Sequence, residues 1–173
     1  MNRIIRKIVT ILFGDLECAK KEGLICGNNV SIIGRVNFGS EPYLITIEDN
    51  VRLSNNVMLI THDGGNYAFR YLDEYAEVNR FGKIHICSHV FVGANSIILP
   101  NVRIGENSVI GAGSIVTKSV PANSVFAGSP AKFVCGIKQY AERMKNRMPE
   151  NWVPVEYHRN KKEYLLTHIC DPE

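Results

Sequence analysis

The sequence predicts an all-β fold: a parallel β-helix built from six-residue repeats, with an N-terminal helix and a C-terminal helical tail. Two observations support this prediction. An aliphatic residue recurs at every sixth position between Ile86 and Val116. Asparagine or glycine recurs at the fourth position of most of the same hexads. Such regular repetition of one short unit is typical of a solenoid, in which each repeat packs mainly on its neighbours.

Each position of the hexad has a physical role. The aliphatic first position is predicted to fill the interior, and the small or β-branched fifth position fits the tight space beside a corner. The fourth position suits a sharp corner, because asparagine, histidine and glycine tolerate a positive φ better than most residues. Three short strands between three corners give a triangular coil. The first-position residues are Cys26, Ile32, Ile47, Leu53, Ile86, Val92, Ile98, Ile104, Ile110 and Val116, and the fourth position holds Asn29, Asn50, Asn56, His89, Asn95, Asn101, Asn107 and Gly113.

The register is interrupted over residues 38–46 and again over about residues 63–84. Long segments without a pattern inside a compact domain are often functional, and a solenoid can extrude such a loop at a corner. We therefore assign the β-helix to residues 22–133 and treat the second interruption as an extruded loop. Residues 134–173 are assigned to a helical tail, with helices predicted over 134–148 and 161–168 and a break at Pro149, Trp152 and Pro154.

Residues 1–21 are predicted to form an amphipathic helix, because Ile4, Ile5, Ile8 and Leu12 recur at helical spacing. The apolar stretch is too short to span a bilayer, and basic residues interrupt it. Packing on the end of the β-helix is favoured over a peripheral membrane contact, although an amphipathic helix of this kind also suits a membrane surface.

Composition narrows the class of protein. The chain has 173 residues, as expected for one domain, and a formal net charge of +3, which is too small to indicate nucleic-acid binding. Its five cysteines form no CxxC motif. Together with the lack of a recognisable signal peptide, this predicts a reducing, cytoplasmic location.

Several motifs then point to a family. They are IGENSVIGAGSIVTKSVPANSVFAGSPAK at residues 104–132, EPYLI at 41–45, THDGG at 61–65 and FR at 69–70. On these, residues 22–136 resemble the hexapeptide-repeat acetyltransferases, which include the galactoside, maltose and nodulation-factor O-acetyltransferases, and are still more similar to those that decorate bacterial surface polysaccharides. The resemblance implies a left-handed β-helix, a homotrimer with active sites between neighbouring chains, acetyl-coenzyme A as co-substrate, a sugar acceptor, a histidine base and no metal.

The predicted general base is His62, in the THDGG motif at the start of the long interruption. A neutral imidazole can take the proton from an acceptor hydroxyl near neutral pH. The alternative is a structural corner, because position 62 is also fourth in its hexad. Asp63 and Glu41 are predicted to orient or polarise this base, with hydrogen bonding to loop backbone as the alternative. Asn37 and Arg70 are candidates for contacts with the acceptor.

The coenzyme site rests on the resemblance. It implies that the Ala94 backbone N–H lies near the thioester carbonyl as an oxyanion donor, and that the small residues Ala112 and Gly113 leave room for the pantetheine arm. Repeat packing and solvated charge are the alternative interpretations of these positions. The remaining coenzyme contacts implied are Thr117 and Lys118 in the GAGSIVTK segment and Lys132 in SPAK.

Other functions remain open at this point. A γ-type carbonic anhydrase shares the fold and binds zinc through three histidines across a subunit interface. His62, His85 and His89 are the candidates for these ligands, although the last two are one residue closer than is usual there. A β-helix scaffold without activity is a second alternative. Serine acetyltransferases and sugar-nucleotide transferases are disfavoured, because this sequence has no large N-terminal region of the kind that they carry.

Overall fold

The computed structural model describes residues 14–149 and 152–169. The chain divides into two compact units, Met1–Ile137 and Lys138–Glu173. Most of the predicted N-terminal helix, residues 1–13, lies outside the described residues, and residues 14–21 are helical. Within the part of the chain that is described, no helix has the length and apolar character needed to cross a membrane.

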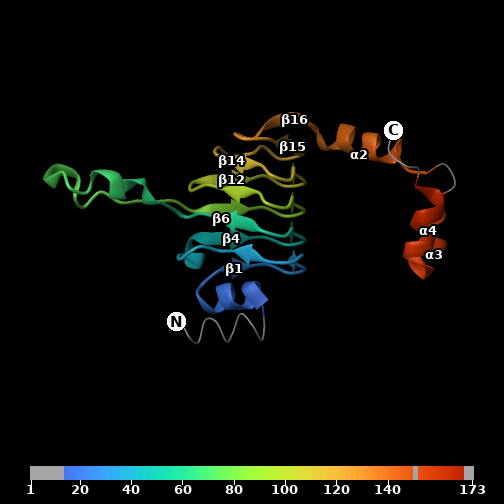
Figure 1. Cartoon of the computed structure of the whole chain (residues 1–173), viewed down its shortest axis with the longest axis horizontal. Coiled ribbons are helices and arrows are strands. Elements are labelled where there is room, and N and C mark those ends of the chain that lie inside the picture. Colours follow the sequence, from blue (N-terminus) through green and yellow to red (C-terminus); the bar gives the residue numbers. More distant parts are fainter. Residues whose placement is uncertain (1–13, 150–151, 170–173) are drawn as a thin grey trace. The chain divides into compact units, whose positions relative to one another are not determined.

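The first unit is a left-handed β-helix whose coils stack on one another (Figure 1). Each coil contributes one short strand to each of three sheets, and the strands are parallel except for the last one, β16. Sheet A contains β1 (Ile25–Cys26), β4 (Ile45–Ile47), β9 (Ile84–Ile86) and β12 (Val102–Ile104); sheet B contains β2 (Ser31–Ile32), β5 (Arg52–Leu53), β10 (Phe91–Val92), β13 (Val109–Ile110), β15 (Ser124–Ala127) and β16 (Lys132–Gly136); sheet C contains β3 (Val36–Asn37), β6 (Val57–Leu59), β11 (Ile97–Ile98) and β14 (Ile115–Val116).

The interior is filled as the hexads predict. The first-position residues from Ile47 onward are 0–1% exposed, and the fifth-position residues from Val51 onward are 0–3% exposed. Serine is suited to the fifth position because its hydroxyl satisfies a corner carbonyl: Ser96 and Ser114 both donate to the Gly111 carbonyl, at 3.0 and 2.6 Å. Cys26 and Ile32, in the first coil, are only partly buried and pack against this core.

The corners also follow the prediction. All of the predicted fourth-position residues have positive φ, between 52° and 68°. His89, at 58°, is one of them, and its ring lies 3.3 Å from the Asn50 amide in the coil below. Neighbouring coils are also linked by an amide hydrogen bond between Asn56 and Asn95, at 3.2 Å. The histidine at position 89 is therefore a structural corner residue.

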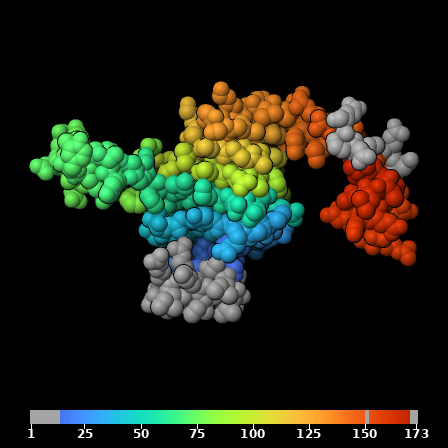
Figure 2. All heavy atoms as spheres, viewed as in Figure 1, coloured from blue at the N-terminus to red at the C-terminus, as the bar shows by residue number. Residues whose placement is uncertain are grey.

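Both interruptions leave the solenoid where the chain passes from sheet C to sheet A, which we call the C/A corner. The first contains a short 3-10 helix, η1 (Pro42–Leu44), and pairing resumes at Ile45. The second forms an arm, residues 62–83. It begins with the antiparallel pair β7 (His62–Asp63) and β8 (Arg80–Phe81) and continues through η2 (Gly64–Phe69) and η3 (Asp73–Tyr75). The arm is seen in green in Figures 1 and 2.

The tail differs from the prediction in two places. Residues 132–136 form β16, paired antiparallel to β15, so that the helix predicted from residue 134 begins only at Ile137, as α2 (Ile137–Lys145). The predicted break after the first tail helix is present, but it is followed by a helix that was not predicted, α3 (Pro154–Arg159), which begins at Pro154 because a first-turn proline has no N–H to leave unsatisfied. The last predicted helix is present as α4 (Lys161–His168).

Candidate active site

The two interruptions meet at one pocket. Because both leave the C/A corner in successive coils, residues 38–44 lie beside the base of the arm. The resulting pocket has a volume of about 330 Å³ and brings together four of the predicted site residues. Its lining residues are Ser40, Glu41, His62, Asp63, Gly64, Asn66, Arg70, Asn79, Arg80 and Phe81.

The centre of this pocket is a hydrogen-bonded pair, His62 and Glu41. The His62 Nδ1 lies 2.9 Å from the Glu41 Oε2. The hydroxyl of Thr61, which is fully buried, donates to the same oxygen at 2.6 Å. The Glu41 side chain is 14% exposed and that of His62 is 41% exposed. Burial alone would raise the pKa of the Glu41 carboxyl, but the hydrogen bonds from Thr61 and His62 outweigh it and hold this pKa below its usual value.

This contact fixes the role of each ring nitrogen. An ionised carboxylate can only accept hydrogen bonds, so the proton of the neutral ring is assigned to Nδ1 and Nε2 is left as an acceptor. The His62 backbone also lacks the positive φ of a corner residue. The corner interpretation of His62 is therefore wrong, and the ring is held with Nε2 able to accept a proton.

An orienting role would place the Asp63 carboxylate against the His62 ring, but its oxygens contact Gly65 and Arg80. Its Oδ1 accepts from the Gly65 N–H at 2.9 Å and caps η2. Its other oxygen lies 3.9 Å from the Arg80 Nη1, and both of these side chains are exposed. The structure thus gives Asp63 the loop-capping role that was the alternative, and gives Glu41 the contact with His62.

The arm supplies residues that the motifs did not indicate. The Phe81 ring lies 6.0 Å from the His62 ring, centroid to centroid. Asn79 accepts from the Arg70 Nη2 at 3.1 Å and from the Asn66 side-chain amide at 2.9 Å. No periodic signal marks these positions, because β7 and β8 pair antiparallel and lie outside the hexad register.

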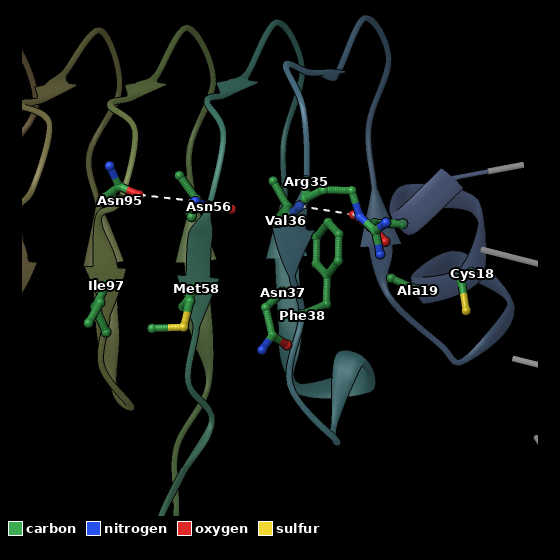
Figure 3. Close-up of a pocket in the computed structure, with 12 residues that line it drawn as sticks. Cys18, Ala19, Arg35, Val36, Asn37, Phe38, Asn56, Met58, Asn95 and Ile97 are labelled. Atoms are coloured by element: carbon green, nitrogen blue, oxygen red, sulfur yellow. Dashed lines mark hydrogen bonds and ion pairs between the residues drawn. The ribbon is translucent and has the colours of Figure 1, made fainter. Parts of the chain in front are cut away.

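Asn37 lies in another pocket, of about 500 Å³, on the outer side of sheet C (Figure 3). Its side-chain oxygen accepts from the Gly39 N–H at 2.8 Å. Arg35, at the edge of this pocket, donates to Asp15 at 2.9 Å. Figure 3 shows Asn37, Met58 and Ile97 in a row across three neighbouring strands. In one chain, therefore, Asn37 does not join the pocket of His62.

The predicted coenzyme residues are divided between two corners and β16, and three of them lie at a different corner from the base. Ala94, Ala112 and Gly113 lie where the chain passes from sheet B to sheet C, which we call the B/C corner, and the Gly113 N–H donates to the Ala94 carbonyl at 2.8 Å. At this corner coils pack closely, since a Cβ on Gly93 would lie 2.5 Å from the Ala112 nitrogen. Thr117 and Lys118 are exposed at the C/A corner, and Lys132 is exposed at the start of β16.

Comparison with known proteins decides the family. Residues 83–118 match the model of the bacterial transferase hexapeptide (six repeats). Protein CapG of Staphylococcus aureus is 42% identical over 149 residues, which cover 85% of this chain and 84% of CapG. The chain belongs to the hexapeptide-repeat acetyltransferases.

Two further members support this placement. The galactoside O-acetyltransferase of Escherichia coli is 43% identical over 94 residues, which are 54% of this chain and 45% of that protein. The crystal structure of the polySia-specific acetyltransferase NeuO superposes with a TM-score of 0.55 at 32% identity, covering 66% of this chain and 52% of NeuO. The acetyltransferase chain thus spans most of CapG but about half of the other two proteins.

In this acetyltransferase the three histidines considered for zinc have separate partners within one chain. His62 pairs with Glu41 at the C/A corner, and His89 is the corner residue beside Asn50. His85, on β9, has its Nε2 2.6 Å from the Glu48 Oε1. This arrangement does not reproduce a three-histidine site within one chain.

His85 does belong to a different cluster. Ligand atoms of Glu48, His85 and Cys87 lie within 4.8 Å of one another. However, the Arg103 Nη1 lies 2.9 Å from the His85 Nδ1. Because a guanidinium can only donate, Nδ1 is the acceptor and Nε2–H donates to Glu48. A metal-binding histidine normally keeps its second N–H for an acceptor, so Arg103 disfavours a metal here.

Proposed function

We propose that this chain transfers the acetyl group of acetyl-coenzyme A to a hydroxyl of a sugar or polysaccharide precursor, with His62 as the general base. The observation that carries the proposal is the Glu41–His62 pair, which holds an imidazole in a pocket with its Nε2 available as an acceptor. The named activities of the galactoside and polysialic acid acetyltransferases support a sugar acceptor.

The chemistry follows from the geometry of the pair. His62 Nε2 takes the proton of the acceptor hydroxyl as its oxygen attacks the thioester carbonyl carbon. The Ala94 N–H is our candidate donor to the oxyanion of the tetrahedral intermediate. The C–S bond then breaks, and the coenzyme thiolate recovers the proton from His62. Glu41 stabilises the imidazolium that exists between these steps, because its lowered pKa keeps it ionised at neutral pH.

We further propose that each active site is formed by two chains of a trimer. In one chain, His62 lies at the C/A corner, and Ala94 and Ala112 lie at the B/C corner. These two corners are at opposite ends of the sheet C strands. Three copies whose C sheets face a threefold axis would place the C/A corner of one copy beside the B/C corner of the next. Lys118 and Lys132 are then our candidates for the coenzyme phosphates.

The character of sheet C supports this arrangement. From β6 to β14 its outer row consists of the half-buried side chains of Met58, Ile97 and Ile115, which are aligned by strand register, whereas Asn37 at the start of the row in β3 is exposed and polar. The equivalent row of sheet A includes His85 and Arg103, which are charged or polar. An apolar row of this kind is better suited to an interface than to solvent.

Thiol release from acetyl-coenzyme A tests the activity. We expect the purified protein to release coenzyme thiol only when a sugar or nucleotide-sugar is present, because direct transfer needs an acceptor in place of water. The product should gain one acetyl group that mild base removes, as an ester but not an amide allows. Coenzyme binding without release against a broad acceptor panel would instead indicate a non-catalytic scaffold.

Complementation between inactive copies tests the shared site. We expect neither His62→Ala nor Ala112→Trp to transfer acetyl alone, because one lacks the base and the other fills the space for the pantetheine arm. Co-expressed copies should recover activity, since roughly a quarter of the sites in random trimers combine an intact His62 with an intact Ala112. Mixed trimers isolated through two affinity tags would be assayed. Activity no higher than that of the separate variants would place the whole site within one chain.

A further inference from the structure

The pocket around His62 contains a guanidinium that the fold leaves without a carboxylate partner. Arg70 lines the pocket, and its Nη2 donates to the neutral side-chain oxygen of Asn79 at 3.1 Å. Within residues 14–149 and 152–169 no ion pair involves Arg70. The Arg70 guanidinium has five N–H donors, and among the described residues Asn79 is the acceptor assigned to one of them.

The two carboxylates of the same pocket have other partners. Glu41 accepts from His62 and Thr61. Asp63 caps η2 at Gly65 and faces Arg80 at 3.9 Å. Neither carboxylate is therefore placed to neutralise Arg70.

Arg70 is also held in position. The Asn66 amide donates to the Asn79 side-chain oxygen at 2.9 Å and to the Val78 carbonyl at 2.8 Å, and the Asn79 amide donates to the Glu77 carbonyl at 3.0 Å. These bonds join the two halves of the arm beside its base. A positioned guanidinium with open donors is suited to bind a carboxylate or a phosphate.

We propose that the acceptor of this acetyltransferase is an anionic sugar, whose carboxylate or phosphate is bound by Arg70 while the hydroxyl to be acetylated faces His62. Phe81, which also lines the pocket, would contact the sugar ring. This inference rests on the proposed function and names its substrate class. Arg80 is a weaker contributor, because the Asp63 carboxylate already faces it at 3.9 Å.

The test compares three acceptors and two readouts. The acceptors are a neutral hexoside, the corresponding uronic acid and the corresponding sugar phosphate. Equilibrium binding by calorimetry is measured without acetyl-coenzyme A, and kcat/KM is measured by thiol release. We expect at least one anionic acceptor to bind about tenfold more tightly than the neutral one at low salt, and less so as salt rises. The anion that gains more identifies carboxylate or phosphate as the group recognised.

Three variants locate the recognition. R70Q should remove the preference for the anion while leaving the KM for acetyl-coenzyme A unchanged. N79D keeps an oxygen that accepts from Arg70 and adds the missing negative charge, although it loses the hydrogen bond to the Glu77 carbonyl, so it should weaken anion binding. K83Q removes an exposed charge from the same arm, outside the pocket lining, and should change nothing.

The outcomes separate this inference from the proposed function. Equal binding of neutral and anionic sugars, or an R70Q effect on acetyl-coenzyme A in place of the acceptor, overturns the inference even when acetyl transfer is efficient. Tight, Arg70-dependent binding of the anion without thiol release supports the anion site and overturns the proposed transfer reaction.

Discussion

Replacing His62 with alanine is expected to lower the turnover number for acetyl transfer by about a hundred- to ten-thousand-fold, the usual contribution of a positioned general base. A sugar hydroxyl is a poor nucleophile until its proton is removed, and His62 is held by Glu41 with Nε2 free to accept that proton. Coenzyme binding and the proposed trimer should be nearly unchanged, because the His62 side chain is partly exposed and outside the core. Thiol release at saturating acetyl-coenzyme A, with binding and sedimentation measured in parallel, checks this.

Two matched variants sharpen the assignment. His89→Asn should retain full activity, because asparagine also adopts the positive φ of 58° at that corner. Glu41→Gln should lower turnover by about tenfold or more, since an amide cannot stabilise the imidazolium as a carboxylate does. The lowered pKa of Glu41 keeps this carboxylate ionised down to acidic pH, so a comparison of wild type and Glu41→Gln at neutral pH measures the loss of its charge. An inactive His89→Asn with a fully active His62→Ala would reverse the two roles.

The contrast between these histidines shows what the sequence could predict. The hexad records steric demands that recur in every coil: an apolar residue inside, a small residue beside the corner and a positive φ at the corner. Those demands are local, so they identified His89 as a corner residue and the core residues of every coil from Ile47 onward. By the same rule His62 was also a corner candidate, and only the family motif favoured catalysis.

The site itself depends on contacts that have no period. Glu41 and His62 are 21 residues apart, and they meet because both interruptions leave the same corner in successive coils. Asn79 and Arg80 could not be predicted, because their places are set by an antiparallel pair outside the register. Likewise, residues 134–136 of a predicted helix belong to β16 because Val134 and its neighbours extend sheet B, a pairing that helical spacing alone cannot reveal.

A second large effect is expected in the core: Ile104→Ala should lower the free energy of unfolding by about 2–5 kcal/mol. Ile104 is fully buried in sheet A, and the β-helix has no second layer that could move in to fill the cavity. Ile104→Val should cost only about 0.5–1.5 kcal/mol.

The same substitution at an exposed position of sheet A provides the control. Ile25 is 61% exposed, so Ile25→Ala should change stability by less than Ile104→Val. Denaturant midpoints measured at one protein concentration, so that assembly contributes equally to each variant, give the ranking. If Ile104→Ala unfolds no earlier than Ile25→Ala, the coils do not depend on a densely packed interior. The hexad would then report corner geometry alone, and the fold would be stabilised mainly by the hydrogen bonds and amide contacts between coils. The full burial of the first-position residues from Ile47 onward favours the opposite result. Ile104 pairs in register with Ile86 in one neighbouring coil and with Val120 in the other, so the loss of its aliphatic side chain weakens two interfaces at once.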